Sequence, residues 1–186
     1  MKTVNEPIAH VEALSDGRLI VWDFSQARKL YIEGFYGKPL GIAKPREDFE
    51  APLILDPIEG IYLHEKGLIN IYTADAEHIE IKEIHEKVTS NLEGFEDRYQ
   101  VYWDLREKGY KVTPGIKYGC DFAVYEHGPG LDHAPFIVQV RKASELLTAQ
   151  EVVESGRLAS TVRKTFTIAV VSEEKISYLS FKWWRP

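Results

Sequence analysis

Residues 99–140 read YQVYWDLREKGYKVTPGIKYGCDFAVYEHGPGLDHAPFIVQV, a stretch with a helical pattern, extended apolar runs and a glycine-rich loop. Large side chains recur at intervals of four, three and three residues, at Phe95, Tyr99, Tyr102 and Leu105. This spacing predicts an amphipathic helix that ends at Lys108-Gly109, where a basic last turn meets a glycine stop. Extended segments are expected at 110–112, 120–125 and 136–140. The stretch therefore predicts a helix followed by the strands of a sheet.

The remainder of the C-terminal half continues this pattern. Thr148 is a suitable cap for a helix over 149–163. Two apolar runs, 165–171 and 176–183, flank Ser172-Glu173-Glu174 and predict a final hairpin. We therefore expect a C-terminal domain, residues 94–186, with a small mixed sheet flanked by two helices.

Residues 1–93 predict a separate N-terminal domain of mixed structure, which makes the whole chain α/β (α+β). Apolar runs at 8–13 and 18–22 flank Ser15-Asp16-Gly17, and an Asp-Gly pair is typical of a β-hairpin turn. The elements expected next are a helix capped by Ser25 and ending near Glu33, an irregular loop over 34–48, a strand at 53–55, a helix from Asp56-Pro57 to Lys66, a strand at 68–72 and a helix at 79–88. A polar break at 91–94 is the predicted domain boundary.

The composition favours a cytoplasmic globular protein. At 186 residues and 44% hydrophobic content, the chain can bury a core in one large or two small domains. Its single cysteine, Cys120, excludes an internal disulfide, and no Cys/His spacing typical of zinc sites occurs. The first residues lack a secretory signal, and no apolar run reaches the roughly 20 residues that span a bilayer. We expect neither secretion nor membrane insertion.

The charge of the chain is unevenly distributed. A net charge of −6 argues against a nucleic-acid partner, because phosphate binding needs clustered Lys and Arg. Basic residues nevertheless gather in three places: Lys38, Lys44 and Arg46; Arg141 and Lys142; and Arg157, Arg163 and Lys164. Acidic residues crowd the segment 47–97. The sequence is therefore compatible with a locally basic site on an acidic protein.

Three polar side chains in or near the quoted stretch carry the groups that phosphodiester cleavage needs. Tyr125 ends an apolar run, His133 follows the loop EHGPGLD, and Lys164 precedes another apolar run. A phenol, an imidazole and an ammonium can deprotonate a hydroxyl, protonate a leaving oxygen and neutralise a phosphate without a metal ion. We interpret them as the candidate catalytic residues of a ribonuclease.

Each of these residues also has an ordinary structural interpretation. Tyr125 can be a half-buried aromatic at a strand end, and Lys164, which closes the predicted helix, can serve the helix macrodipole. His133, beside Asp132, can be a surface group or a local cap, and His127 offers the same imidazole chemistry. We favour His133 because it leads directly into a strand and is more rigidly placed than a residue inside a glycine turn.

Other polar residues are open to two interpretations. Arg157 can stack on a base or hold a phosphate, or it can form a surface salt bridge. Asp104 and Asp121 could serve a two-metal nuclease, but positions on a helix face and at a strand start give them simpler roles. The sequence has no P-loop, GxGxxG, HExxH or GxSxG motif. We therefore predict metal-independent chemistry without a cofactor.

Several segments together resemble the catalytic subunit of archaeal tRNA-splicing endonucleases. They are YWDLREKGYKVTPGIKYGCDFAVY at 102–125, GPGLDHAPFIVQV at 128–140, GRLASTVRKTFTIAVV at 156–171 and YLSFKWWRP at 178–186. The resemblance is strong over the C-terminal half, and the N-terminal half is similar in its general layout.

This resemblance implies a reaction and roles for the three residues. Tyr125 would deprotonate or orient a 2′-hydroxyl, His133 would protonate the departing 5′-oxygen, and Lys164 would stabilise the charge on the phosphate. The products would be a 2′,3′-cyclic phosphate and a 5′-hydroxyl. The substrate would be the bulge-helix-bulge of precursor tRNA, with Arg157 as one of the arginines that grip a flipped base. A second gripping arginine has no counterpart in this sequence.

The resemblance also implies an assembly, because two active sites must be spaced to cut both bulges. The inserted loop with Lys38, Lys44 and Arg46 looks like an addition of crenarchaeal catalytic subunits, which pair with a separate structural subunit, and we expect it to bring Lys44 to RNA. We expect a heterotetramer of two catalytic and two structural chains, with a homo-oligomer as the alternative. A catalytically silent structural or RNA-binding subunit is the alternative function, and the presence of all three candidate catalytic residues argues against it.

Overall fold

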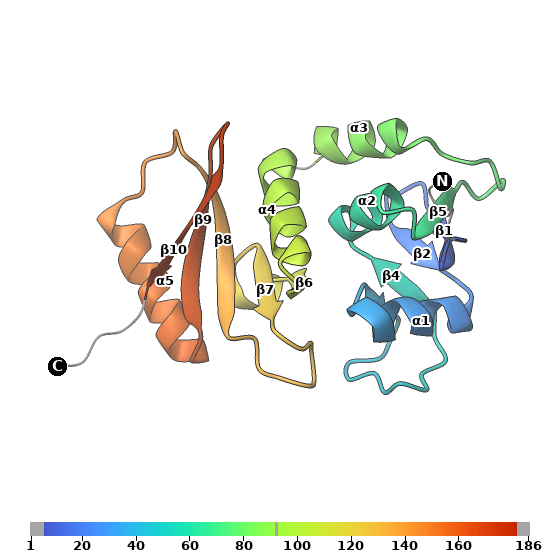
Figure 1. Cartoon of the computed structure of the whole chain (residues 1–186), viewed down its shortest axis with the longest axis horizontal. Coiled ribbons are helices and arrows are strands. Elements are labelled where there is room, and N and C mark those ends of the chain that lie inside the picture. Colours follow the sequence, from blue (N-terminus) through green and yellow to red (C-terminus); the bar gives the residue numbers. More distant parts are fainter. Residues whose placement is uncertain (1–5, 92, 182–186) are drawn as a thin grey trace. The chain divides into compact units, whose positions relative to one another are not determined.

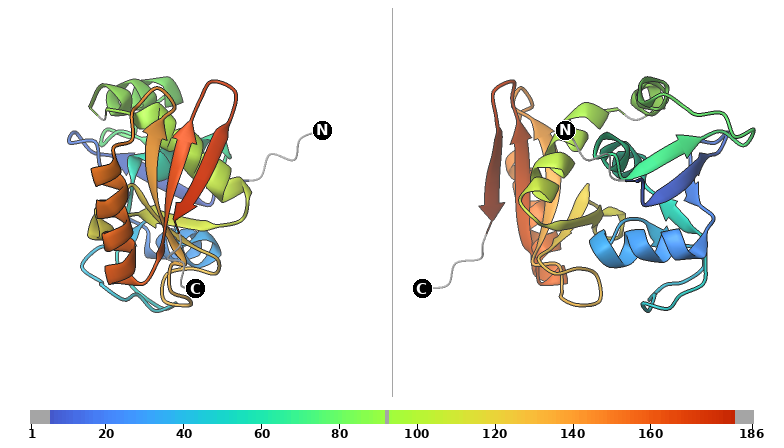
Figure 2. Two further views of the ribbon diagram at one scale, coloured as in Figure 1. Left: turned by 90° about the vertical axis from the view of Figure 1, so that its left-hand side faces the viewer. Right: turned by 45° about the vertical axis from the view of Figure 1, so that its right-hand side comes forward.

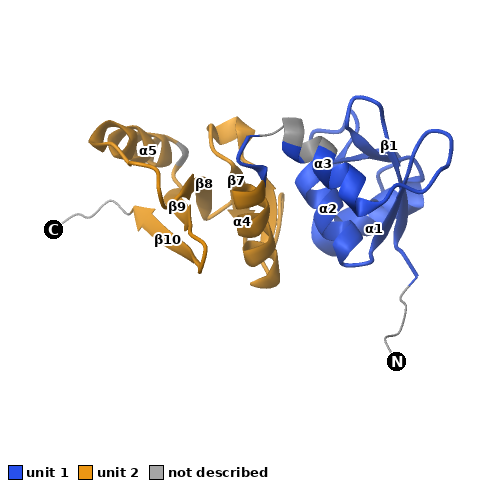
Figure 3. Ribbon diagram, turned by 90° about the horizontal axis from the view of Figure 1, so that it is seen from above, with its two compact units in different colours: residues 1–95 blue, residues 96–186 orange. Residues whose placement is uncertain are grey.

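The computed structural model describes residues 6–91 and 93–181, and the chain divides into two compact units (Figure 3). Unit 1 is Met1–Phe95 and unit 2 is Glu96–Pro186. Each unit has its own five-stranded sheet. The predicted mixed α/β class is therefore confirmed.

Unit 1 combines a mixed sheet with three helices among its described residues. Its strands are β1 (Ala9–Ala13), β2 (Leu19–Val21), β3 (Lys38–Pro39), β4 (Leu53–Leu55) and β5 (Ile69–Tyr72), and its helices are α1 (Phe24–Gly34), α2 (Pro57–Glu65) and α3 (Ile81–Asn91). The strand order is β3-β4-β2-β1-β5. The predicted hairpin is confirmed by the antiparallel pairing of β1 with β2, and Gly17 in its turn has a φ of 86°, which favours glycine.

Two expectations for unit 1 were wrong in detail. The cap of α1 is Asp23 and not Ser25, because the Asp23 carboxylate accepts the backbone N–H of Gln26 and the helix has already begun at Phe24. The loop predicted over 34–48 contains the short strand β3, which pairs with β4. The start of α2 is as expected, with Asp56 in a capping box and a proline in the first turn.

Unit 2 contains the predicted mixed sheet and its two helices. Its strands are β6 (Lys111–Pro114), β7 (Phe122–Tyr125), β8 (Phe136–Lys142), β9 (Thr165–Val171) and β10 (Ile176–Phe181); its helices are α4 (Phe95–Glu107) and α5 (Ala149–Val162), with a 3-10 turn η1 (Ile116–Tyr118). The order is β10-β9-β8-β7-β6, and β8 and β9 are parallel while the other neighbours are antiparallel. Thr148 caps α5 as predicted. The predicted last strand extended to 183, and residues 182–183 lie outside the described part.

The two helices of unit 2 cover opposite faces of this sheet (Figures 1 and 2). Phe166 and Ile168 of β9 pack with Ala159 of α5 in one buried cluster. On the other face, Tyr102 of α4 contacts Phe122 of β7, with ring centroids 6.0 Å apart. Because side chains alternate along a strand, each strand contributes to both cores. The central strands of the sheet are therefore packed on both faces and give the residues at their ends a rigid support.

No helix in the described ranges 6–91 and 93–181 is both long enough and apolar enough to cross a membrane.

Candidate active site

The ends of three neighbouring strands define one end of the unit 2 sheet. β7 runs antiparallel to β8, with Val124 opposite Phe136, and β8 runs parallel to β9, with Phe136 opposite Thr165. The last residue of β7 and the first residues of β8 and β9 therefore lie side by side. Since neighbouring strands are about 4.8 Å apart, the span from β7 to β9 is about 10 Å. This arrangement brings Tyr125 and Lys164, which flank the span, to the same end of the sheet. It brings His133 there as well, because His133 is three residues before β8.

Tyr125 is the last residue of β7 and is half-buried. It pairs with Lys111 of β6 across the antiparallel ladder. Ala123, two residues earlier, lies opposite Ile137, which belongs to the core under α5. Because residues two apart share a face, the Tyr125 side chain emerges on the α5 face of the sheet.

Lys164 follows α5 rather than closing it, which corrects the sequence interpretation. Arg163 is the C-cap, in a left-handed conformation with a φ of 53°, and the backbone N–H of Lys164 donates to the carbonyl of Ala159. This cap ends the helix and turns the chain directly into β9. The backbone that follows Lys164 is fixed as well, because the backbone N–H of Thr165 donates to the carbonyl of Pro135.

The ammonium group of Lys164 is held by the backbone of Ala134, the residue after His133. Its Nζ donates to the carbonyl of Ala134 at 2.8 Å, and it lies 5.2 Å from the ring centroid of Tyr118. Burial and then the nearby charge of Lys117 lower the pKa of Lys164, while the charge of Asp132 opposes them. The ammonium is thus bound to a carbonyl outside the helix, so the helix macrodipole does not explain its position.

The loop that leads to His133 is organised by a single carboxylate. Oδ2 of Asp132 accepts the backbone N–H groups of Glu126 and His127, each at 3.1 Å, and Oδ1 accepts that of Gly128 at 2.9 Å. Burial favours the neutral acid, but these three donors outweigh it and the pKa of Asp132 is lowered. The side chains of His127 and His133 are both exposed. Asp132 therefore fixes the turn immediately before His133, a role that the sequence did not reveal.

Two residues close to Lys164 were missed by the sequence interpretation. Lys117 and Tyr118 belong to η1, between β6 and β7, and the Tyr118 ring packs against the core under α5. The Nζ of Lys117 is 5.8 Å from the centroid of the same ring. The only signal in the sequence was the pair of glycines that bracket η1, Gly115 and Gly119, which mark a turn without indicating its neighbours.

The other candidate RNA-binding residues are exposed but are not part of this strand end. Arg157 is on the surface of α5. Lys38, Lys44 and Arg46 belong to unit 1, in β3 and in the loop that follows it. That these four residues act on the same RNA as the three candidate catalytic residues therefore stays a prediction.

The two acids considered as metal ligands make structural contacts. Oδ2 of Asp121 accepts the backbone N–H of Val140 at 2.7 Å and the side-chain amide of Gln139 at 2.9 Å. Asp104 binds the Lys108 ammonium and the Tyr178 hydroxyl. Within the described ranges, no three His, Cys, Asp or Glu side chains gather as metal ligands do.

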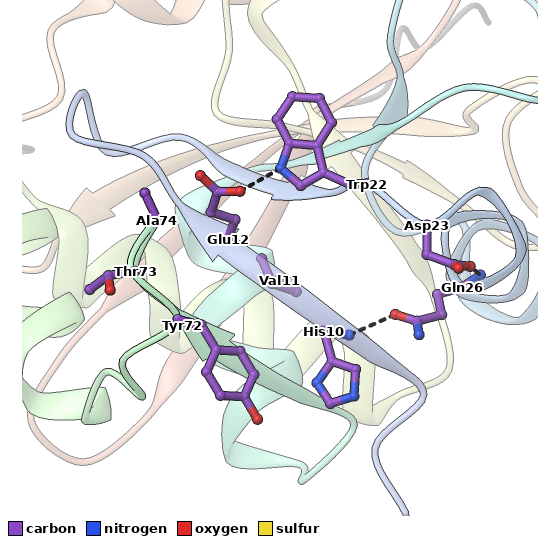
Figure 4. Close-up of a pocket in the computed structure, with 10 residues that line it drawn as sticks. His10, Val11, Glu12, Trp22, Asp23, Gln26, Tyr72, Thr73 and Ala74 are labelled. Atoms are coloured by element: carbon purple, nitrogen blue, oxygen red, sulfur yellow. Dashed lines mark hydrogen bonds between the residues drawn. The ribbon is translucent and has the colours of Figure 1, made fainter.

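Unit 1 has an open cavity of about 510 Å³ that contains none of the predicted site residues (Figure 4). Its walls include His10 and Glu12 of β1, Trp22, and Tyr72 of β5. The indole N–H of Trp22 donates to the Glu12 carboxylate at 2.7 Å, and the ring centroids of His10 and Tyr72 are 5.6 Å apart. The residues that line the cavity include Glu12 and Asp23 but neither Lys nor Arg, which phosphate binding usually needs, so unit 2 remains the candidate site for phosphodiester chemistry.

Comparison with known proteins agrees with the division of the chain into two parts. Residues 12–85 match the N-terminal domain of tRNA intron endonucleases, and residues 95–178 match their catalytic C-terminal domain. The chain is 44% identical over 172 residues to the tRNA-splicing endonuclease of Hyperthermus butylicus, covering 91% of this chain and 95% of that enzyme. It is 43% identical over 178 residues to the tRNA-splicing endonuclease of Saccharolobus solfataricus, covering 93% of this chain and 98% of that enzyme. The chain therefore belongs to the tRNA-splicing endonuclease family and contains its catalytic domain.

Proposed function

We propose that this chain cleaves precursor tRNA at bulge-helix-bulge splice sites, in the cytoplasm and without a metal ion, with Tyr125, His133 and Lys164 as its catalytic residues. The observation that supports the assignment best is the 2.8 Å hydrogen bond from Lys164 to Ala134, the residue after His133. It ties Lys164 to the segment that carries His133, at the end of the sheet where β7 terminates in Tyr125.

The proposed reaction is an internal transfer of the phosphate. Tyr125 orients or deprotonates the 2′-hydroxyl, whose oxygen attacks the adjacent phosphorus and forms a 2′,3′-cyclic phosphate. The bond to the 5′-oxygen breaks, and His133 gives that oxygen a proton, which leaves a 5′-hydroxyl. Lys164 stabilises the negative charge on the phosphate during transfer, and its fixed hydrogen bond keeps it in place before the substrate arrives.

The RNA would extend beyond the scissile phosphate. We assign Arg157 to a flipped base of the bulge and Lys38, Lys44 and Arg46 to the RNA backbone, since all four side chains are exposed. In this proposal residues 94–186 form the catalytic domain, and residues 1–93 present the loop that carries Lys44. The active assembly would be a heterotetramer of two catalytic and two structural chains, of the crenarchaeal type.

Cleavage of a bulge-helix-bulge RNA in EDTA tests the reaction, with the chain alone and with a structural subunit. We expect cleavage to survive chelation and the 3′ fragment to accept a 5′ label from a polynucleotide kinase without prior phosphatase treatment. His133→Ala and Lys164→Ala should each lower the rate about 100-fold or more, since positioned acid-base and charged groups contribute 10²–10⁴-fold.

His127→Ala is the matched control, because His127 is a second exposed imidazole in the same loop. It should keep nearly the wild-type rate. Unchanged cleavage by His133→Ala would refute the assignment, and a loss confined to His127→Ala would transfer the acid role to that residue. No cleavage under any of these conditions would favour a structural or RNA-binding subunit.

A further inference from the structure

The turn η1 brings a second lysine to the ring that supports Lys164. The Nζ atoms of Lys117 and Lys164 lie 5.8 Å and 5.2 Å from the centroid of the Tyr118 ring. The two lysines come from segments that are far apart in the sequence, so this convergence is a product of the fold. Two ammonium groups beside one aromatic ring concentrate positive charge at this point of the fold.

The Tyr118 ring is held in place by packing and by backbone hydrogen bonds. The Tyr118 ring packs against the buried cluster that includes Phe166 and Ile168, and the backbone N–H of Tyr118 donates to the carbonyl of Gly115 at 2.7 Å. Gly115 in turn donates its backbone N–H to the carbonyl of Asp121 at 2.8 Å. The ring is therefore held between η1 and the sheet, and the lysines rest on a surface that does not need to be ordered by a ligand.

Neither of these two lysines is in direct contact with a carboxylate in the described part of the chain. Across residues 6–91 and 93–181, the ion pairs of the structure include neither Lys117 nor Lys164. The acid that acts on Lys164, Asp132, has both carboxylate oxygens occupied by backbone donors. Two ammonium groups brought together without a carboxylate in direct contact favour the binding of an anion.

We propose that Lys117 is a further RNA-binding residue, whose ammonium group binds the RNA backbone at a phosphate next to the one that Lys164 stabilises. This inference rests on the proposed function, because it takes Lys164 as the contact to the scissile phosphate. The Lys117 side chain is exposed, so it can reach a flanking phosphate, whereas Lys164 is half-buried at the strand end. Tyr118 acts through the two lysines and is a positioning residue.

The test is single-turnover cleavage of bulge-helix-bulge RNA by the complete assembly, over a range of enzyme and KCl concentrations. Lys117→Gln should raise the enzyme concentration for half-maximal rate roughly fivefold and leave the maximal rate within about twofold, since a phosphate contact contributes to binding. The slope of log affinity against log salt should fall by about 0.7 to 1, the contribution of one phosphate contact. Lys117→Arg should restore both values.

Lys82→Gln is the control, because Lys82 is an exposed lysine of α3 next to acidic residues and loses the same charge. It should leave the affinity and the salt slope unchanged. The inference is overturned if Lys117→Gln behaves like Lys82→Gln, or if it lowers only the maximal rate. If the wild-type assembly cleaves normally, either of these results overturns the inference and leaves the proposed function standing. If the wild-type assembly does not cleave, the proposed function is overturned as well.

Discussion

At the scale of single residues, Asp132 shows how one side chain can shape the loop beside a candidate catalytic group. Its two carboxylate oxygens accept three backbone N–H groups, from Glu126, His127 and Gly128. Only a carboxylate presents acceptors on both oxygens, so an amide cannot replace it. The next residue is His133, and its backbone position therefore depends on these hydrogen bonds.

Asp132→Asn should destabilise this loop and reduce cleavage. The amide NH₂ would face at least one backbone N–H, and the loss should lower the free energy of unfolding by about 1–2 kcal/mol. Urea unfolding at neutral pH measures this change, and the cleavage rate should fall because His133 is less well placed. Asp48→Asn, in an exposed turn of unit 1, is the control and should leave both quantities unchanged. Equal stability of the two variants would contradict the role given to Asp132.

The stabilising effect of Asp132 should depend on pH in a defined direction. Because its folded-state pKa is lowered, the carboxylate stabilises the fold fully above the unfolded-state pKa of about 3.9. This contribution is lost as the pH falls from that value through the lower folded-state pKa. The difference in unfolding free energy between wild type and Asp132→Asn should therefore narrow below about pH 4 and stay constant above it. A difference that grows in acid would contradict the lowered pKa.

At the scale of secondary-structure elements, two glycines of unit 2 should respond oppositely to the same substitution. A Cβ at Gly115 would lie 2.6 Å from Sγ of Cys120, 2.7 Å from its carbonyl oxygen and 2.8 Å from the backbone nitrogen of Phe122. These atoms belong to the buried support of η1 and cannot move easily. A Cβ at Gly156, inside α5, would have no neighbour within 4 Å.

We therefore expect Gly115→Ala to lower the free energy of unfolding by about 1–3 kcal/mol, as overpacking does. Gly156→Ala should raise it by about 0.5–1 kcal/mol, because alanine is favoured in a helix interior. Chemical denaturation of the two full-length variants gives both values. Changes of the same sign in the two variants would contradict the expected difference in packing around Gly115 and Gly156.

The elements also show where sequence patterns are informative. The periodic side chains of α4, the Asp-Gly turn between β1 and β2, and the Asp56-Pro57 start of α2 are local signals, and the structure contains the corresponding elements. For α1, Ser25 was the predicted cap, but Asp23, two residues earlier and equally suited to the position, caps the helix. The loops are harder, since β3 forms only by pairing with β4.

The candidate site illustrates the same limit. Tyr125, His133 and Lys164 could be selected from the sequence because each adjoins an apolar run, and strand register then brings their segments to one end of the sheet. Lys117 and Tyr118 lie in a short turn without periodicity, and their contact with Lys164 depends on long-range packing. A local pattern contains no information about such a neighbour.

At the scale of the whole molecule, the two edges of the unit 2 sheet differ in their ability to pair with another chain. β6 forms one edge and contains Pro114, which lacks an N–H and weakens edge pairing. β10 forms the other edge and has neither proline nor charge over its six residues, ISYLSF. Its Leu179 is 50% exposed. An edge of this kind is suited to pairing with another chain, and we predict that the proposed assembly forms through β10.

Leu179→Lys should therefore weaken the assembly without unfolding the chain. A lysine on the edge strand opposes pairing with a second sheet, and an exposed position tolerates the charge. Size-exclusion chromatography with light scattering, on the chain co-expressed with a structural subunit, should show a four-chain species for wild type and a smaller one for Leu179→Lys. Leu146→Lys, at a leucine that is 92% exposed before α5, introduces the same charge and should keep the four-chain mass. An unchanged mass for Leu179→Lys, with the thermal unfolding midpoint preserved, would exclude β10 as the contact between chains. A four-chain species formed by this chain alone would favour the homo-oligomer.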